Sequence, residues 1–391
     1  MPFVVYLLGL AVFAQGTSEF MLAGLVPGIA RELGVSIPAA GLLTSAFAAG
    51  MVVGAPLMAV LSLRWSRRSA LLSFLVAFLI AHVVGAVTTD YAVLLATRVV
   101  AALANAGFLA VAMATAIALA PPRAKGRATS ILLSGVTIAC VAGVPGGALL
   151  GELWGWRSAF WAVALALVPA IAAVLRSVPG GAPGGTVRGE ARALRHPRLL
   201  VLLLLGALVN GATFSTFTYL APLLTGVTGI AQVWLPGLLA LFGLGSFAGV
   251  TISGRLADTR PKVLLVAGGV ALAAGWALFG LTAGVPVAAV ALVLVQGTLS
   301  FAVGSTLISQ VLYAATTAPT LSGGFATAAL NVGAVLGPWL GGLAIGAGLG
   351  FRSPLWVSAA LVTLALAVAA AARPYHQAEP ARARPVSGAS L

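Results

Sequence analysis

The sequence predicts an all-α membrane protein in which 12 transmembrane helices form two pseudo-symmetric six-helix halves. Three observations lead to this fold class: the composition, the spacing of the apolar runs and an internal repeat. Of the 391 residues, 61% are hydrophobic and only 7% are charged, and the mean hydropathy is +1.11. Soluble domains carry about 25% charged residues. The chain is therefore expected to use lipid as its solvent.

Twelve apolar runs are each long enough for a membrane helix, which needs about 20 residues. They cover residues 3–28, 38–62, 69–88, 91–119, 128–151, 158–177, 198–224, 233–256, 261–282, 286–312, 322–347 and 353–372. A long polar interruption separates the sixth run from the seventh. The expected domains are an N-terminal six-helix half (1–177), a cytoplasmic linker (178–197), a C-terminal six-helix half (198–372) and a cytoplasmic tail (373–391).

The basic residues indicate how the chain lies across the membrane. Most of the 21 Lys and Arg residues fall in alternate loops, in the linker and in the tail. The positive-inside rule therefore predicts a multi-pass protein of the cell membrane with both termini and the linker in the cytoplasm. The net charge of +14 is explained by this topology and by contact with anionic lipid. No nucleic-acid partner is expected.

The two halves share small-residue motifs, and matching motifs are separated by nearly the same number of residues. Gly54 meets Gly249 at an offset of 195 residues, and glycines of the fifth run meet glycines of the eleventh at an offset of 194. Glycines four residues apart lie on one helix face and let two backbones approach closely. Duplicated halves with a site between them are a transporter architecture. The matching glycines are Gly143 and Gly147 in the first half and Gly337 and Gly341 in the second.

Two firmly ionisable residues lie deep inside the predicted spans. Glu19 precedes Pro27 by eight residues and Arg98 follows Asp90 by eight, so both lie roughly 12 Å from the same membrane face. A carboxylate at membrane depth costs roughly 2.5–3.5 kcal/mol on insertion scales and is functional by default. Beside a cation it can stay ionised, and without the cation it takes up a proton. We therefore expect Glu19 and Arg98 to share one polar network that exchanges protons as substrate comes and goes.

Structural alternatives remain for these residues. Glu19 could only hydrogen-bond a neighbouring helix, and Arg98 could only bond backbone carbonyl groups. His82, a further ionisable residue in the spans, is expected to be a packing histidine. Cys140 is the single cysteine, so no intramolecular disulfide can form, and it is expected to be a small packed residue.

The segment AVLSLRWSRR, which ends at Arg68, resembles the loop signature of the major facilitator superfamily. The chain resembles this family along its whole length. Leu63 stands where the family has Asp, so this copy is degenerate. A second copy, GRLAD, is more complete. In the family this motif latches the cytoplasmic gate. The resemblance therefore implies gating roles for Arg64, Arg67, Arg68, Gly254 and Asp258.

Further motifs resemble the drug–proton antiporter subgroup. The proline–glycine motif of antiporters is matched in the fifth run, where the physical reason is a close-packed, bendable helix between the halves and the alternative is ordinary packing. The matching residues are Gly143, Pro145, Gly147 and Gly151. GTSEFMLAGLVPGIA, WGWRSAFW and FTYLAPLL are similar to chloramphenicol-resistance exporters of high-GC bacteria. Arg98 stands where the family has a proton-coupling arginine, with Ala102 in place of the usual Gly.

A pocket for a neutral, partly apolar drug needs aromatic walls and few polar groups. For each aromatic candidate, packing against lipid is the alternative. The candidates for substrate binding are Glu19, Phe20, Asn105, Phe108, Asn210, Phe214, Phe217, Tyr219 and Asn331, with Gln296, Phe301 and Trp339 as further candidates.

The first functional prediction is a proton-coupled exporter of chloramphenicol or similar amphiphilic drugs, which works by alternating access and confers antibiotic resistance. No Walker sequence is present, so ATP is not expected as the direct fuel. Neither a cofactor nor a metal is expected. The expected partners are the drug, protons and membrane lipid, and nothing in the sequence requires an oligomer, so a monomer is expected.

Two other classes of function are weaker predictions. An antiporter that exports a sugar or another metabolite is the alternative, but the few polar side chains in the spans argue against sugar. A membrane enzyme would need clustered His, Asp or Cys at membrane depth, and the chain has only three histidines. A sensor would need an output domain. The sequence therefore favours a secondary active transporter over an enzyme.

Overall fold

The structure is a computed structural model that describes residues 2–62, 65–121, 125–178, 197–257, 259–314 and 322–372. Within these residues all regular structure is helical. Twelve helical segments are long and apolar enough to cross a membrane, which confirms the predicted all-α fold and the number of spans. The first span, Phe3–Phe20, is interrupted at Met21, after which a second helix runs from Leu22 to Leu33.

The N-terminal half begins with α1 (Phe3–Phe20), α2 (Leu22–Leu33), α3 (Ile37–Ser62), α4 (Arg67–Val87) and α5 (Tyr91–Leu119). Its fifth span starts as α6 (Lys125–Ile138), passes through a π-helical turn, η2 (Ala139–Gly143), and ends as α7 (Val144–Trp154). Helix α8 (Trp156–Ser177) completes this half.

The C-terminal half repeats the pattern with α9 (Pro197–Thr218), α10 (Leu220–Gly226), a 3₁₀ turn η4 (Gln232–Trp234), α11 (Leu235–Leu256) and α12 (Pro261–Thr282). It continues with α13 (Pro286–Ala314), α14 (Ser322–Ala344), a π-helical turn η5 (Ile345–Leu349) and α15 (Ser353–Ala371).

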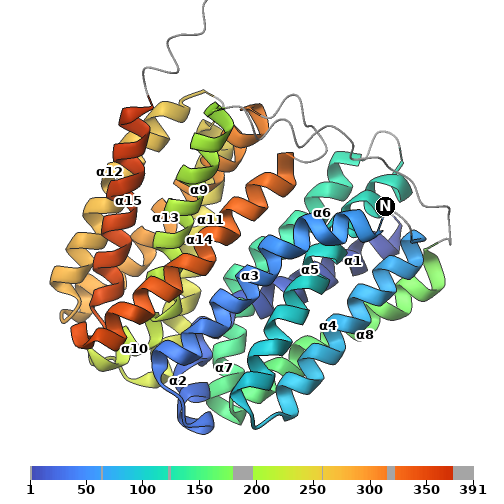
Figure 1. The fold of residues 1–391 in the computed structure, drawn as a ribbon, viewed down its shortest axis with the longest axis horizontal. Coiled ribbons are helices and arrows are strands. Elements are labelled where there is room, and N and C mark those ends of the chain that lie inside the picture. The colour runs from blue at the N-terminus through green and yellow to red at the C-terminus, as the bar shows by residue number, and fades with distance from the viewer. Residues whose placement is uncertain are drawn as a thin grey trace, which may run out of the picture.

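The two halves lie side by side, with α1–α8 on the right of Figure 1 and α9–α15 on the left. Helix α8 ends and α9 begins at the same end of the bundle, which we call the linker end. At the opposite end, called the far end, α2 and α7 of the first half contact α10 and α11 of the second. The two halves meet there and, more extensively, along α3 and α14, where Ser45 Oγ donates to the Val335 carbonyl over 2.8 Å.

Glycine seams show the internal repeat in three dimensions. The glycines of the fifth span pack against the first span, and the glycines of α14 pack against α9 in the same way. Helices α3 and α5 are joined by a second seam, and α11 and α13 by its counterpart. At most of these positions a side chain would meet the backbone or Cβ of the neighbouring helix, so glycine sets the distance between the helices. The seams contain Gly143, Gly147 and Gly151; Gly333, Gly337 and Gly341; Gly50 and Gly54; and Gly245 and Gly249.

Each half has its own apolar core. One cluster of buried side chains lies entirely within the first half, and a second lies mostly within the second half. A small third cluster joins them, formed by Ala48, Phe214 and Ala334 with Phe20 packed against it. Because each half has its own core, the halves can move against one another without unfolding when contacts between them, such as that of α3 with α14, rearrange.

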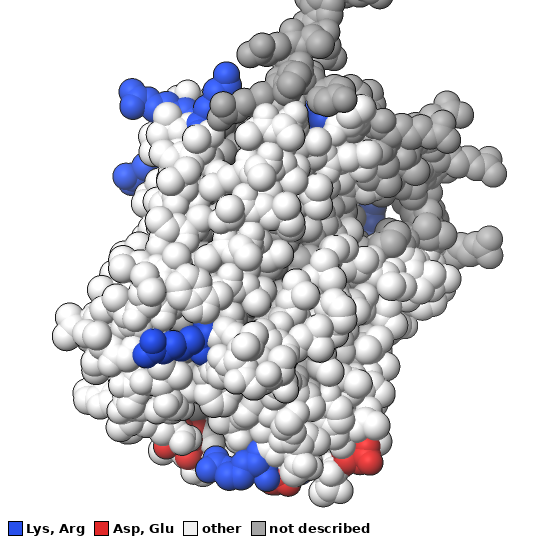
Figure 2. Space-filling view, turned by 60° about the vertical axis from the view of Figure 1, so that its left-hand side comes forward, with Lys and Arg blue, Asp and Glu red and all other residues white. Residues whose placement is uncertain are grey.

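The outer surface fits a membrane protein. Many large apolar side chains are exposed along the spans, among them Val53, Ile80, Leu165, Val270 and Leu281. In Figure 2, acidic side chains are seen only near the lower end of the molecule, and a group of basic side chains lies at the upper end. Most of the face between them is uncharged.

Candidate functional site

Glu19 lies at the end of α1, where the first span is interrupted before Met21. Its side chain is half-buried. Within the part of the chain that the structure describes, it makes no hydrogen bond and no ion pair. The next residue, Phe20, contacts Phe214 of the other half with 5.9 Å between ring centroids. The carboxylate therefore lies beside the place where the two halves touch.

Arg98 is almost completely buried in α5, at 1% exposure, and binds α1 instead of a carboxylate. Its Nη1 donates to Ser18 Oγ over 2.8 Å, and its Nη2 donates to the Ser18 carbonyl oxygen over 2.8 Å. The guanidinium also lies over the Phe47 ring of α3, 4.5 Å from its centroid. The charges of Arg98 and Glu19 are close enough to interact. Their predicted shared network is thus a pair of neighbouring charges without a direct bond.

His82 of α4 is a buried, packed histidine with both ring nitrogens bonded, as the sequence suggested, and it also extends this network. Its Nε2 lies 2.6 Å from Ser18 Oγ, and its Nδ1 lies 2.8 Å from the Phe78 carbonyl oxygen. Ser18 was not among the predicted residues. Its position next to Glu19 was the available signal, but sequence spacing does not show which helix a side chain faces.

Gln15 was also missed. It precedes Glu19 by four residues, so the two share a face of α1. The side chain is 1% exposed, and neither its amide nitrogen nor its amide oxygen has a partner among the described residues. Such a group normally finds a hydrogen bond when buried, so it is available to a ligand, to water or to Glu19.

A row of aromatic side chains in mutual contact extends from the contact between the halves into the second half. Phe214 packs on Phe217 at 6.3 Å between centroids, and Phe217 stacks on Phe242 at 4.7 Å. Phe242 in turn meets Phe301 at 6.3 Å. Four of the five rings, counting Phe20, were predicted substrate contacts, and Phe242 was not. These rings provide an apolar wall next to Glu19.

The predicted amides all bond to the protein itself. Asn105 Nδ2 lies 3.5 Å from Met51 Sδ, and Asn210 Nδ2 donates to the Leu330 carbonyl over 2.7 Å. Asn331 donates to the Thr327 carbonyl over 2.9 Å, and Gln296 donates to the Leu272 carbonyl over 3.1 Å. The amide oxygen of Gln296 has no partner among the described residues.

The remaining candidates differ in their surroundings. Phe108 is fully buried in the core of the first half, whereas Trp339 is 46% exposed. Tyr219 is buried between the halves, where its hydroxyl donates to the Pro338 carbonyl over 2.8 Å and its ring lies against Gly41 of α3. The structure therefore gives Tyr219 a sealing position.

The fifth span uses its two sides for different contacts. Gly143 and Gly147 pack on Thr17 and Met21 of the same half, as Gly151 does on Leu25. The opposite side of the span reaches α11, where Gly243 lies against the backbone of Cys140 and Val141. Pro145 is half-buried just after the π-helical turn. The glycines thus serve close helix packing within the first half, while the span as a whole lies between the halves.

The predicted gating residues lie at the linker end. Arg67 and Arg68 begin α4 and are exposed, with Ser66 capping the helix through a bond from Ser69 N. Gly254 of α11 has open space around it. Arg64 and Asp258 fall outside the described residues, so the latch inferred from the loop motif stays a prediction.

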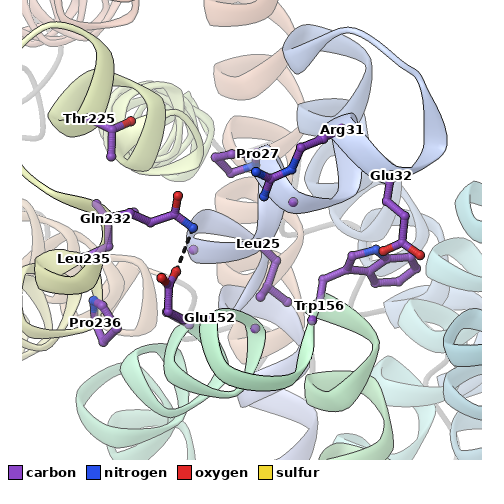
Figure 3. Close-up of a pocket in the computed structure, with 15 residues that line it drawn as sticks. Leu25, Pro27, Arg31, Glu32, Glu152, Trp156, Thr225, Gln232, Leu235 and Pro236 are labelled. Carbon is purple, nitrogen blue, oxygen red and sulfur yellow. Dashed lines mark hydrogen bonds between the residues drawn. The ribbon is translucent and has the colours of Figure 1, made fainter.

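A cavity of about 370 Å³ lies between the halves at the far end. Figure 3 shows Arg31 and Glu32 of α2 on one side and Gln232 on the other, with Glu152 between them. Gln232 Nε2 donates to Glu152 Oε2 over 2.6 Å and so bridges the halves. Glu32 instead pairs with Arg157, whose Nη2 also donates to the Thr88 carbonyl over 2.8 Å.

Comparisons with known proteins agree with this architecture. Residues 8–327 match the family model described as Major Facilitator Superfamily. A chloramphenicol resistance protein of Streptomyces lividans is 57% identical over 375 residues, which cover 94% of this chain and 96% of that protein. An inner membrane transport protein of Escherichia coli, YdhP, is 35% identical and covers 92% of this chain and 93% of its own.

A chloramphenicol efflux pump of Mycobacterium tuberculosis is 30% identical over 86% of this chain and 84% of its own. A solved structure of a bacterial homolog of the human lysosomal transporter Spinster, inward-facing and occupied, has a TM-score of 0.76 and covers 97% of this chain and 98% of that one. Its identity is 17%, so this match shows the fold alone. The chain is a multi-pass membrane transporter that belongs to the major facilitator superfamily.

Proposed function

We propose that this protein exports chloramphenicol or similar amphiphilic drugs in exchange for protons, and that it thereby confers antibiotic resistance. The observation that carries the proposal is Glu19. It is a half-buried carboxylate at the end of α1, it has no bonded partner among the described residues, and it lies beside the Phe20–Phe214 contact between the halves. A proton carrier needs a carboxylate that both substrate and solvent can reach.

Glu19 supplies the exchange chemistry as follows. A carboxylate without a bonded cation takes up a proton readily in an apolar site, and a nearby positive charge favours its release. A drug that enters beside Phe20 competes for the same space and removes water. Drug binding therefore favours proton release, and drug departure favours proton uptake. The aromatic chain that begins with Phe20 and Phe214 supplies the apolar contacts that an amphiphilic drug needs.

The substrate class rests on the relatives and on the polarity of the site. The name of the Streptomyces lividans relative refers to chloramphenicol resistance, and 57% identity over nearly the whole chain supports the same substrate class. The amides near the centre are engaged with backbone carbonyls, as for Asn210 and Asn331. A sugar needs many free hydrogen-bonding groups, so a sugar exporter is a weaker alternative.

We further propose that the linker end is cytoplasmic and that the transporter acts as a monomer. Basic residues gather at that end, among them Arg67, Arg68, Arg255, Arg260 and Lys262, as the positive-inside rule requires. The pathway lies between two halves of one chain, so a second copy is not needed to form it. Labelling of single cysteines at Arg68 and Trp154 with a membrane-impermeant reagent tests the orientation. The cysteine at Trp154 is expected to react in intact cells, and the cysteine at Arg68 only after the cells are opened.

The test of function is chloramphenicol transport in proteoliposomes under an imposed pH gradient. The parent protein is expected to move the drug against an opposing proton flux, whereas Glu19→Gln exchanges drug for drug and ignores the gradient. Coupled transport by Glu19→Gln would place the proton site elsewhere. A parent protein that transports other amphiphiles but ignores chloramphenicol would refute the substrate assignment, and competition by sugars would support the alternative.

A further inference from the structure

A one-way chain of hydrogen bonds runs from Arg98 through Ser18 to His82. The Phe78 carbonyl can only accept, so the His82 Nδ1 that lies 2.8 Å from it must carry a proton. In the neutral ring, Nε2 is then an acceptor, and the Ser18 hydroxyl donates to it over 2.6 Å. Because the Ser18 hydroxyl hydrogen is used in this bond, Ser18 Oγ can only accept a further hydrogen bond, and it accepts one from Arg98 Nη1 over 2.8 Å. Each donor and acceptor therefore has one role.

The surroundings keep His82 in this role. The ring is 1% exposed, stacks on Phe78 at 4.3 Å between centroids and meets Phe160 of α8 at 5.6 Å. Helix α1 presents Ser18 to it and α5 presents Arg98, which is the charged group among these neighbours. A second proton on the ring would remove the acceptor of the Ser18 hydroxyl and place two positive charges together. The chain of bonds thus requires Nε2 to remain unprotonated.

The position of the guanidinium matters for Glu19. Both terminal nitrogens of Arg98 are held by Ser18, one by its hydroxyl and one by its carbonyl oxygen. Ser18 directly precedes Glu19, and successive residues point about 100° apart around a helix. A guanidinium held in this way cannot present the same pair of N–H groups to the Glu19 carboxylate, and its Nε has no partner among the described residues. Ser18 and Glu19 are therefore alternative partners for the end of the guanidinium that carries its two terminal nitrogens.

We propose that His82, acting through the Ser18 hydroxyl, is a positioning residue that holds Arg98 away from Glu19 and leaves this carboxylate free to exchange its proton. This inference rests on the proposed role of Glu19 as the proton carrier. It gives the side chains of Ser18 and His82, which bond each other across α1 and α4, a function in coupling. Without the Nε2 acceptor, the Ser18 hydroxyl turns away and releases one nitrogen of Arg98. The freed guanidinium then pairs with Glu19 and stabilises its ionised form.

The test compares how drug–proton exchange depends on pH in proteoliposomes with the same pH on both sides. His82→Phe keeps an aromatic ring of similar size but lacks the acceptor, and Ser18→Ala breaks the chain from the other helix. Both are expected to shift the pH of half-maximal exchange downward by about one unit, because a paired arginine favours the ionised carboxylate. Thr115→Val is the matched control, since it removes a buried hydroxyl of α5 that bonds only the Val111 carbonyl of the same helix.

A second background separates this inference from the proposed function. In Glu19→Gln, drug-for-drug exchange needs no proton, so adding His82→Phe is expected to leave its rate unchanged. An uncoupled parent protein would refute the proposed function. A coupled parent whose pH profile is unchanged by both His82→Phe and Ser18→Ala would refute the positioning role. The positioning role would also be refuted if His82→Phe slowed drug-for-drug exchange in the Glu19→Gln background as much as it slows drug–proton exchange in the parent. Chloramphenicol binding and thermal unfolding identify a misfolded variant, and infrared spectra that report the protonated carboxyl group of Glu19 give the same comparison in whichever variant is folded.

Discussion

Gly243 of α11 packs directly on the π-helical turn of the other half, and replacing it with alanine tests how the halves fit together. A Cβ at this position would lie 2.5 Å from the Cys140 carbonyl oxygen and 2.9 Å from Val141 Cα. These are backbone atoms, so no side chain can rotate away. The two helices must separate instead, by roughly 0.8 Å to reach an ordinary C···O contact of about 3.3 Å.

The size of the effect follows from this overlap. Overpacking of a well-packed contact typically costs about 1–3 kcal/mol. The contact lies between the halves, so the penalty applies to this arrangement of the halves and not to the folding of either half. A penalty of this size changes a conformational equilibrium by about 5–150-fold. Gly243→Ala is therefore expected to populate arrangements in which the far end is more open, with little change in thermal stability.

Electron spin resonance distances across the far end measure this shift. Spin labels at Trp154 and Val233, which are 72% and 68% exposed, report the separation of the halves in a protein whose Cys140 is replaced by alanine. Gly237→Ala is the matched control, because it lies on the same helix with no atom within 4 Å of the added methyl. Equal distance distributions in Gly243→Ala and Gly237→Ala would refute the reasoning.

Three further changes test other contacts. Gln232→Ala removes the 2.6 Å bond to Glu152 and should widen the same spin-label distances less than Gly243→Ala does, because exposed bonds to charged groups contribute about 0–1 kcal/mol; an equal or larger effect would contradict this. Tyr219→Phe removes the bond to the Pro338 carbonyl and should destabilise the protein by about 1 kcal/mol in thermal unfolding, so an unchanged midpoint would count against a sealing role. Gly333→Ala should lower the unfolding midpoint more, by about 1–3 kcal/mol, because the added methyl meets the backbone of α9 within one half; a midpoint as high as the parent's would contradict this.

The helices and the repeat were predictable because the residues encode them directly. Membrane spans need long apolar runs, and all twelve predicted runs correspond to spans in the structure. Gly54 and Gly249 occupy equivalent seams in the two halves, as their spacing predicted. Glycine at such positions is required by the backbone contact itself. Composition and spacing therefore carry the fold.

The polar contacts of the site were less predictable. Glu19 and Arg98 were placed at the same depth by counting residues, but depth does not determine the direction in which a side chain points around its helix. The bonds from Ser18 to Arg98 and His82 span 80 and 64 residues of sequence, and they depend on how three helices cross. Sequence spacing could not show this.

Contacts between helices explain the other differences. The motif around Gly147 indicated a close-packed helix between the halves, but not that its glycines serve the packing of the fifth span on the first. Phe242 was not singled out, because only the crossing of α9 and α11 brings it against Phe217. The bridge from Gln232 to Glu152 joins two loop-proximal residues that no motif linked.

The most direct test of the account is proton release on drug binding. Chloramphenicol is added to the purified protein in weakly buffered solution near neutral pH, and the change in pH is recorded for the parent and for Glu19→Gln. The account predicts that the parent releases protons in proportion to the drug bound, whereas Glu19→Gln binds the drug without releasing any. Equal release from both proteins, or binding by the parent without release, would contradict the claim that Glu19 carries the exchanged proton.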